Sequence, residues 1–127
     1  MTTALLVGLA GMIGALLRFC ADTVFAHIGR FAPGSPQHLP LATLLVNAVG
    51  SFIIGLAGGL AAHSGLSEEW HTAIATGLAG GLTTFSSFAV STVGLWWEGR
   101  RIVAGLNVAL NVLLGLGFAY LGLLLGS

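Results

Sequence analysis

Four long apolar runs constrain this chain more than any other feature of its sequence. The first covers residues 4–26 and is interrupted only by one arginine and one aspartate, whereas the runs over 41–62, 72–97 and 102–127 contain no charged residue. A helix needs about 20 apolar residues to cross the hydrocarbon core of a bilayer. We therefore predict an all-α integral membrane protein, a single domain of four transmembrane helices over about residues 4–27, 41–62, 71–97 and 101–126.

The composition supports this class and excludes several functions. Only 6% of the 127 residues are charged and 56% are hydrophobic, against roughly 25% charged residues in a soluble domain. The chain has no lysine. It therefore cannot bind a nucleotide through the lysine of a P-loop or form a Schiff base with a substrate. Four arginines at zero net charge form no basic face for nucleic acid. We also find no nucleophile and base pair that would indicate an enzyme.

The charges of the connections are unevenly distributed. The first connection holds Arg30 together with all three prolines, and the third holds Arg100 and Arg101, whereas the second connection and both termini hold no lysine or arginine. The positive-inside rule then predicts that the first and third connections are cytoplasmic. A subunit with this asymmetry is expected to insert in one orientation.

Several polar side chains fall inside the predicted helices, where an unpaired polar group is costly. Asn47 lies in the second run, and Asn107 and Asn111 lie four residues apart in the fourth, on one helix face. Each amide either joins two helices by a hydrogen bond or lines a path for an ion. Arg18 and Asp22, also four apart, either form an ion pair near one end of the first helix, or Arg18 extends its charged end towards the interface without a partner.

The third run has an unusual centre, GLAGGLTTFSSF at residues 77–88. An unbroken helix over 72–97 would be about 39 Å long, but this stretch combines glycines with threonines and serines. A break there would free carbonyls that bind cations and amides that attract anions. The sequence therefore predicts an ion site at a break in the third helix, the alternative being a glycine packing seam without a break. Phe85 and Phe88 lie on adjoining positions of one face, where their partly positive edges can contact an anion or simply pack.

Three stretches together resemble the signatures of the Fluc fluoride channels, also called the CrcB family. They are GMIGALLRF at 11–19, LPLATLLVNAVGSFIIG at 39–55 and GLAGGLTTFSSF at 77–88, in matching order and spacing. The resemblance implies a dimer of antiparallel subunits with two narrow fluoride pores between them and a structural sodium ion at its centre. It also implies passive export of fluoride from the cytoplasm through the cell membrane of a microbe.

The same resemblance assigns roles to individual residues. It implies a fluoride path that includes Asn47, Thr84, Phe85, Ser86, Phe88, Asn111 and Arg18. Asn47 would donate to fluoride near a pore entrance, and Phe85 and Phe88 would present their ring edges to it. Backbone carbonyls of Gly80 and Thr83 would bind the sodium ion.

The sequence departs from the family pattern at three positions. Ala42 stands where relatives commonly have glycine, Ala89 where a hydroxyl is common, and Ser91 where an acid is frequent. The family includes homodimers and pairs of oppositely oriented relatives. The arginine asymmetry favours the pair of relatives for this chain, and a homodimer stays open.

The main alternative function is a proton-coupled exporter of the small multidrug resistance type. Such a transporter needs a carboxylate inside the membrane, but Asp22, Glu68, Glu69 and Glu98 all fall at or beyond the ends of the predicted helices. A non-transporting scaffold would explain glycine seams but not the polar stretch that follows them. A pore of neutral donors suits a small, strongly hydrated anion, because it binds the ion weakly enough to release it.

Overall fold

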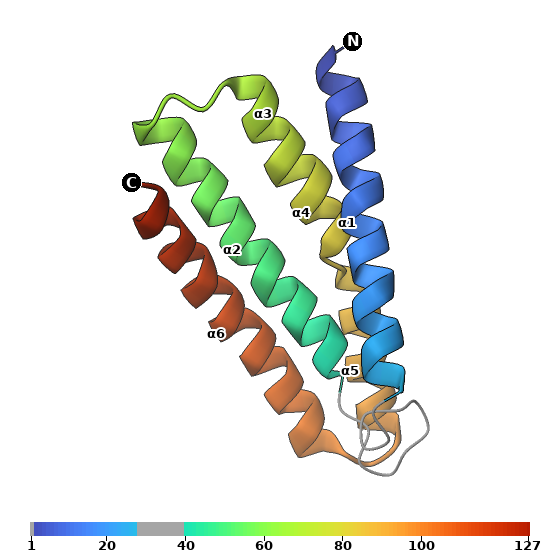
Figure 1. Ribbon diagram of the computed structural model, residues 1–127. Coiled ribbons are helices and arrows are strands. Elements are labelled where there is room, and N and C mark those ends of the chain that lie inside the picture. The colour runs from blue at the N-terminus through green and yellow to red at the C-terminus, as the bar shows by residue number, and fades with distance from the viewer. Residues whose placement is uncertain (1, 28–39) are drawn as a thin grey trace.

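The computed structural model describes residues 2–27 and 40–127, and the regular elements in these ranges are helices (Figure 1). They are α1 (Thr2–Ala26), α2 (Leu41–His63), α3 (Glu68–Thr72), the π-helical segment η2 (Ala73–Leu78), α4 (Ala79–Leu82), α5 (Phe85–Trp97) and α6 (Arg101–Gly126). Among the described residues, four helical stretches are long and apolar enough to cross a membrane: α1, α2, residues 68–97 and α6. This confirms the predicted all-helical class with four such helices. Arg30, Pro33 and Pro36 lie outside the described residues.

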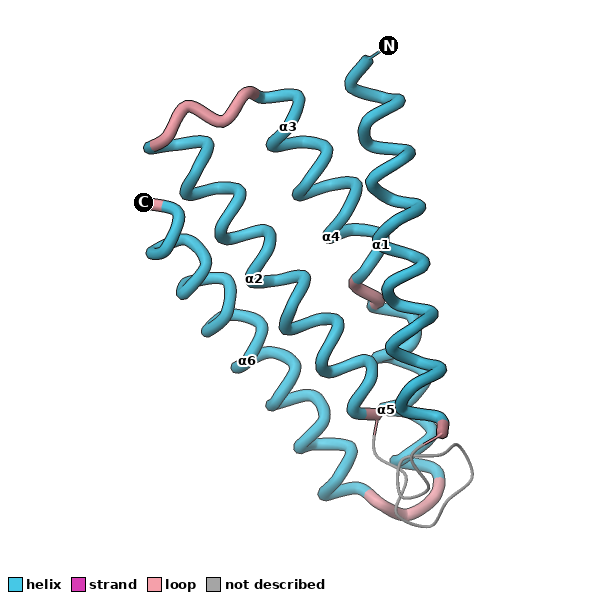
Figure 2. The backbone as a smooth tube through the Cα atoms, in the orientation of Figure 1, coloured by secondary structure: helices cyan, strands magenta, loops and turns pink. Residues whose placement is uncertain are grey.

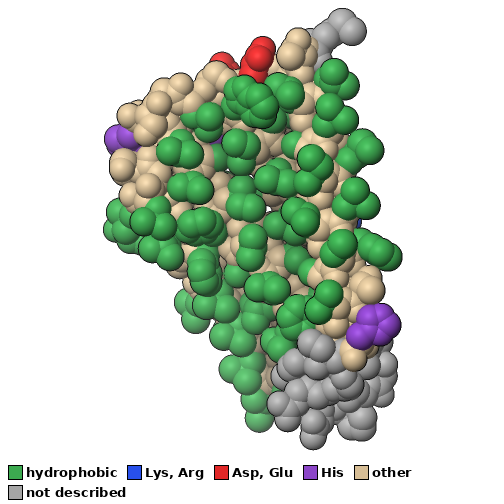
Figure 3. Space-filling model, viewed as in Figure 1, with side chains coloured by type: hydrophobic (Ala, Val, Ile, Leu, Met, Phe, Trp, Pro, Cys, Tyr) green, Lys and Arg blue, Asp and Glu red, His purple; other side chains and the backbone are tan. Residues whose placement is uncertain are grey.

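The four stretches run up and down between two ends of the molecule. Figures 1 and 2 place both termini and the α2–α3 connection at one end, and the α5–α6 turn at the other. Glu68 and Glu69 begin α3 at the first end, and Arg101 begins α6 at the second. Hydrophobic side chains cover most of the face between these ends (Figure 3). Most of the charge in the described residues therefore lies at or near the ends, as expected for a protein surrounded by acyl chains, with Arg18 inside α1 as an exception.

Helices α2 and α6 pack closely because glycines stand where they meet. A Cβ atom built on Gly59 would lie only 2.6 Å from the carbonyl oxygen of Leu123, and one built on Gly122 would overlap the carbonyl oxygen of Phe52. In lipid, where water no longer drives helices together, such close van der Waals contact supplies much of the association energy. The α2–α6 pair thus forms one half of the bundle.

Helix α1 and the third membrane-spanning stretch, residues 68–97, form the other half of the bundle, again through close contacts at glycines. A Cβ atom on Gly77 would lie 2.7 Å from the carbonyl oxygen of Val7, and one on Gly14 would lie 2.8 Å from the amide nitrogen of Leu82. Leu82, the last residue of α4, is only 4% exposed. These contacts hold η2 and α4 against α1.

The chain between α4 and α5 is extended for two residues. Thr83 has ψ 157°, and Thr84 has φ −148° and ψ 117°. Threonine favours this conformation because its branched Cβ is restricted in a helix. The Oγ1 atom of Thr84 accepts a hydrogen bond of 3.1 Å from the backbone N–H of Ser87 and so caps α5. The extended residues are therefore threonines, whereas the neighbouring Gly77 and Gly81 are used for contact with α1.

We predict that Gly122→Ala destabilises the protein by about 1–3 kcal/mol, because the added methyl group forces α2 and α6 apart. Gly117→Ala is the matched control, since a Cβ atom at Gly117 meets nothing within 4 Å in this chain. Thermal unfolding in detergent compares the two variants, which share the same gain in helix propensity. Equal midpoints for both variants would contradict the packing account.

Candidate functional site

The side chain of Asn47 in α2 binds the backbone of Thr84 at two points. Its Oδ1 atom accepts a hydrogen bond of 2.8 Å from the Thr84 N–H, and its Nδ2 atom donates one of 3.2 Å to the Thr84 carbonyl. Thr84 is only 7% exposed. A buried backbone group without a partner is costly in a membrane, so one carboxamide satisfies both groups that α4 and α5 leave unpaired at this residue.

From Asn47 a chain of side-chain hydrogen bonds runs through α6 to α5. The Nδ2 atom of Asn47 donates to Oδ1 of Asn111 at 3.1 Å, and Nδ2 of Asn111 donates to both oxygens of Asn107, at 2.8 Å to the backbone carbonyl and 3.1 Å to Oδ1. The Nδ2 atom of Asn107 donates to Oγ1 of Thr92 at 2.9 Å, which donates to the carbonyl of Phe88 at 2.8 Å. The helix-joining hydrogen bonds considered for the asparagines are thus present.

A cavity of about 380 Å³ lies beside this network and is open on one side. It is lined by Asn47, Ser51, Ile54, Thr83, Thr84, Phe85, Phe88, Asn111 and Val112. All of these side chains are uncharged, and five of them carry an amide or a hydroxyl group. The cavity can therefore offer hydrogen bonds to an ion without binding it through a fixed charge.

Two aromatic rings border the cavity. The ring centroids of Phe85 and Phe88 lie 5.8 Å apart with an interplanar angle of 48°. Phe85 is 79% exposed although it begins a helix inside an apolar span. Because an aromatic edge carries partial positive charge, the tilted pair can act on an anion that approaches from the open side.

The end of α4 offers backbone carbonyl groups. In a continuous helix the Thr84 N–H would bond to the carbonyl of Gly80, but it bonds to Asn47 instead. The backbone N–H and the Oγ1 atom of Thr83 both bond to the Ala79 carbonyl, each at 2.9 Å. Gly80 itself is exposed. The Gly80 carbonyl is thus left without the N–H that would continue its helix, and such carbonyls suit a cation.

The structure brings most of the predicted path residues together. Asn47, Thr84, Phe85, Phe88 and Asn111 line the same cavity. Ser86 is exposed beside it, with its Oγ atom 3.3 Å from Oγ1 of Thr84. Together they form a continuous polar and aromatic border.

Arg18 is placed elsewhere. It is half-buried on α1 and is not among the residues that line the cavity. Within the described part of the chain, no ion pair joins it to Asp22. Its assignment to the fluoride path therefore stays a prediction.

Two polar residues of this region were not singled out from the sequence. Ser51 lines the cavity and Thr92 ends the hydrogen-bond chain. Ser51 follows Asn47 by four residues, so helical spacing could have placed both on one face. Thr92 meets Asn107 only because α5 and α6 fold back on each other, and no local pattern reveals that contact.

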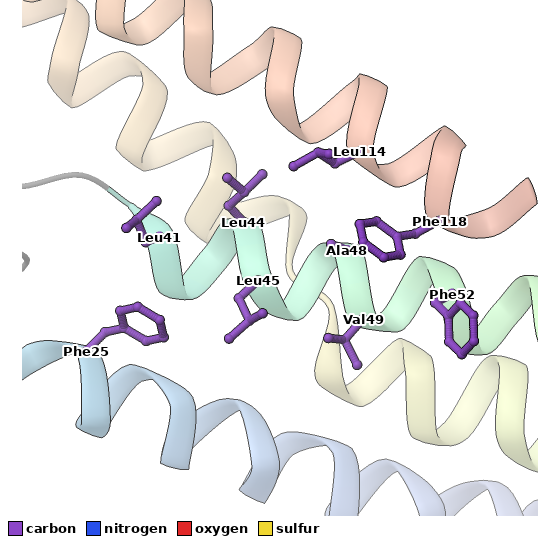
Figure 4. A pocket seen from close by; sticks show the side chains of 9 residues that line it. All are labelled: Phe25, Leu41, Leu44, Leu45, Ala48, Val49, Phe52, Leu114 and Phe118. Atoms are coloured by element: carbon purple, nitrogen blue, oxygen red, sulfur yellow. The ribbon is translucent and has the colours of Figure 1, made fainter. Parts of the chain in front are cut away.

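A larger cavity, of about 490 Å³, lies between α1, α2 and α6 (Figure 4). It is lined by Phe25, Leu41, Leu44, Leu45, Ala48, Val49, Phe52, Leu114 and Phe118. This lining is entirely apolar and cannot replace the hydration shell of an ion. We therefore assign the functional site to the smaller polar cavity.

Comparison with known proteins decides the family. The family model described as "CrcB-like protein, Camphor Resistance (CrcB)" matches residues 5–123. The chain belongs to the CrcB family. This confirms the resemblance found in the three sequence stretches, and membership fits the four apolar helices of a multi-pass membrane protein.

Individual members of the CrcB family are similar over nearly their whole length. A "Fluoride-specific ion channel FluC" of Renibacterium salmoninarum is 62% identical over 121 residues, which are 95% of this chain and 96% of that protein. Proteins of the same name from Shewanella oneidensis and Campylobacter jejuni are 42% and 40% identical, covering 96% and 98% of this chain and 94% and 98% of their own lengths. These names are those of ion channels and not of enzymes.

We predict that Asn47→Leu speeds the hydrogen exchange of the Thr84 amide by about 10- to 100-fold, because the variant removes the acceptor of a buried N–H. Exchange mass spectrometry on peptides that cover residues 82–87 measures this. Ser51→Ala, one turn along α2 in the same cavity, is the control and leaves the exchange unchanged. Equal protection in Asn47→Leu and the unsubstituted chain would contradict the assigned role of Asn47.

Proposed function

We propose that this chain is a subunit of a fluoride-selective channel that passively exports fluoride from the cytoplasm across the cell membrane. The observation that carries the proposal is the uncharged polar cavity, bordered by Phe85 and Phe88, within the apolar spans of a CrcB family member. The names of the similar channels support fluoride as the transported ion. The chain acts as a conduit and not as an enzyme.

The chemistry of the cavity suits fluoride. Fluoride is small and strongly hydrated, so a pore must replace its water with several close donors. Hydroxyl and amide groups of Ser51, Thr84 and Asn47 provide such donors, and Ser86 continues them. With no ionised group in the lining, fluoride meets no deep electrostatic trap and can leave again.

Both N–H groups of the Asn47 side chain are bonded within the chain, to Thr84 and to Asn111. We propose that fluoride shares the N–H that now points to Asn111, since Asn111 lines the cavity with Asn47. The bond to Thr84 is kept, because it holds the backbone between α4 and α5. Asn47 thereby both holds the backbone of Thr84 in place and donates a hydrogen bond to the ion.

A second subunit would complete the pore. The cavity is open on one side, and Phe85 and Val90 on the same helix are 79% and 73% exposed. An antiparallel partner would cover this side and supply the facing wall. The proposal favours an oppositely oriented relative as that partner, on the arginine asymmetry, with a second copy of this chain as the alternative.

A sodium ion would fit the carbonyl groups at the end of α4. The carbonyl of Gly80 lacks the N–H that would bond to it in a continuous helix. Thr83 is extended, so its carbonyl is not aligned with the axis of α4. Carbonyl oxygens are suitable ligands for a hard cation. We propose that these two groups, with the same pair from the partner, hold a structural sodium ion that balances their partial negative charge.

The proton-coupled exporter is less well supported. Glu68, Glu69, Glu98 and Asp22 are all exposed at or near the ends of their helices. None of these carboxylates lines the polar cavity. Proton exchange for a substrate would require such a group inside the membrane, so passive conduction remains the proposal.

We predict that the purified chain, reconstituted in liposomes together with an oppositely oriented homologous chain, releases fluoride and not chloride, as ion-selective electrodes would measure. Release by this chain alone supports a homodimer. If the chain alone releases no fluoride and adding a homologous chain restores release, the result supports a heterodimer of two relatives. Absence of fluoride release in both preparations would contradict transport.

We predict that Phe85→Ile lowers fluoride efflux at least about fivefold, because it removes a ring contact worth about 1 kcal/mol. Phe118→Ile is the matched control, since Phe118 lines the apolar cavity and is not among the residues that line the polar one. Size-exclusion chromatography verifies that both variants assemble as the unsubstituted chain does. Equal efflux from the two variants would remove Phe85 from the proposed path.

We predict that replacing sodium by N-methylglucamine lowers the melting temperature of the assembled protein by roughly 5 °C, because a bound ion stabilises the folded assembly by mass action. Thermal unfolding in detergent measures the shift, and returning sodium at constant ionic strength reverses it. The same melting temperature in both salts would argue against the sodium site.

A further inference from the structure

All three asparagines of this chain belong to one connected hydrogen-bond network, although they come from two helices. Two of them, Asn47 and Asn111, line the polar cavity, whereas Asn107 does not. Asn107 is only 6% exposed, and its partner Thr92 also lies outside the lining. Neither of these two residues therefore meets an ion in the cavity directly.

The direction of the hydrogen bonds is fixed at both ends of the network. At one end the Thr84 N–H is a donor, so the Asn47 carboxamide must turn its oxygen, and not its NH₂ group, towards it. At the other end the Thr92 hydroxyl has its one hydrogen on the Phe88 carbonyl, so Oγ1 is left as an acceptor for Asn107. In the links between Asn47, Asn111, Asn107 and Thr92 every donated N–H thus points towards Thr92, whereas the second N–H of Asn47 returns to the Thr84 carbonyl.

Reversing any one carboxamide breaks this order. If Asn107 turned over, its NH₂ group would face the NH₂ group of Asn111, and its carbonyl would face a hydroxyl whose hydrogen is already used. Asn111 would then have to turn and would present its own NH₂ group to that of Asn47. Two donors facing each other inside a protein leave both without an acceptor, which is unfavourable.

We propose that Asn107 and Thr92 are positioning residues for the ion path. They hold the carboxamide of Asn111, and through it help to hold that of Asn47, so that Asn47 keeps one N–H directed at Asn111 and its oxygen on the Thr84 N–H. An N–H group attracts an anion and a carbonyl repels it, so this orientation sets which charge the cavity accepts. The inference deepens the proposed function and rests on it only for the ion that the cavity conducts.

Thr92→Val tests the proposal, because it keeps the shape of the side chain but removes the acceptor of the Asn107 N–H. Thr92→Ser keeps the hydroxyl and is the conservative variant. Ser91→Ala, one residue earlier in α5 and outside the network, is the control for any general effect on this helix.

The first measurement does not depend on transport. Labelling with ¹⁵N-asparagine gives three side-chain amide pairs in the NMR spectrum of the full chain in nanodiscs, one for each asparagine. We expect Thr92→Val to shift the pairs of Asn111 and Asn47 as well as that of Asn107, and Thr92→Ser and Ser91→Ala to leave all three in place. A shift confined to Asn107 would overturn the proposed relay, by which Thr92 and Asn107 fix the orientation of Asn111 and, through it, that of Asn47.

The second measurement is fluoride efflux from liposomes. We expect Thr92→Val to lower it about tenfold, as loss of one buried partner suggests, and Thr92→Ser to restore it to within about twofold of the unsubstituted chain. In a chain that already carries Asn107→Ala, Thr92→Val should have no further effect, because the two residues act through one path. Additive losses, or full efflux in Thr92→Val, would contradict positioning.

The two measurements separate the two proposals. If the unsubstituted chain releases no fluoride, alone or with a homologous chain, while the NMR shifts reach Asn47, the relay stands and the fluoride function fails. If fluoride is released but the shifts stop at Asn107, the function stands and the relay fails.

Discussion

The hydrogen bonds between Asn47 and the backbone of Thr84 are the interaction on which the rest of the site depends. In a membrane, backbone that leaves a helix must find polar partners within the protein. One carboxamide from α2 supplies both, so α4 can end at Leu82 and α5 can begin at Phe85. This pairing accommodates the extended residues Thr83 and Thr84, and it leaves the Gly80 carbonyl without the N–H that would continue its helix.

The shortage of charge serves both the fold and the proposed function. With 6% charged residues the chain cannot form a water-exposed surface. Its helices associate instead through close glycine contacts such as those of Gly59 and Gly122. The same shortage leaves the cavity lined by amides, hydroxyls and rings. Groups of this kind can replace water around a small anion without holding it permanently.

The sequence predicted the helices better than the details of the site. Runs of more than 20 apolar residues specify membrane helices almost by length alone, and the predicted site residues include six of the nine that line the cavity. Glycine composition suggested where the third stretch would leave its helix, but the extended residues are Thr83 and Thr84, since Gly77 and Gly81 are needed against α1. The bond between Asn107 and Thr92 arises only from the packing of α5 on α6.

The proposed function requires that fluoride passes this protein down its own electrochemical gradient through an uncharged path. The reversal potential of the current through planar bilayers that contain the channel tests it most directly. Under a fluoride gradient with equal chloride on both sides, the account predicts reversal at the equilibrium potential of fluoride, unchanged when a pH gradient is imposed. Reversal near zero, or a reversal that follows the pH gradient, would contradict it.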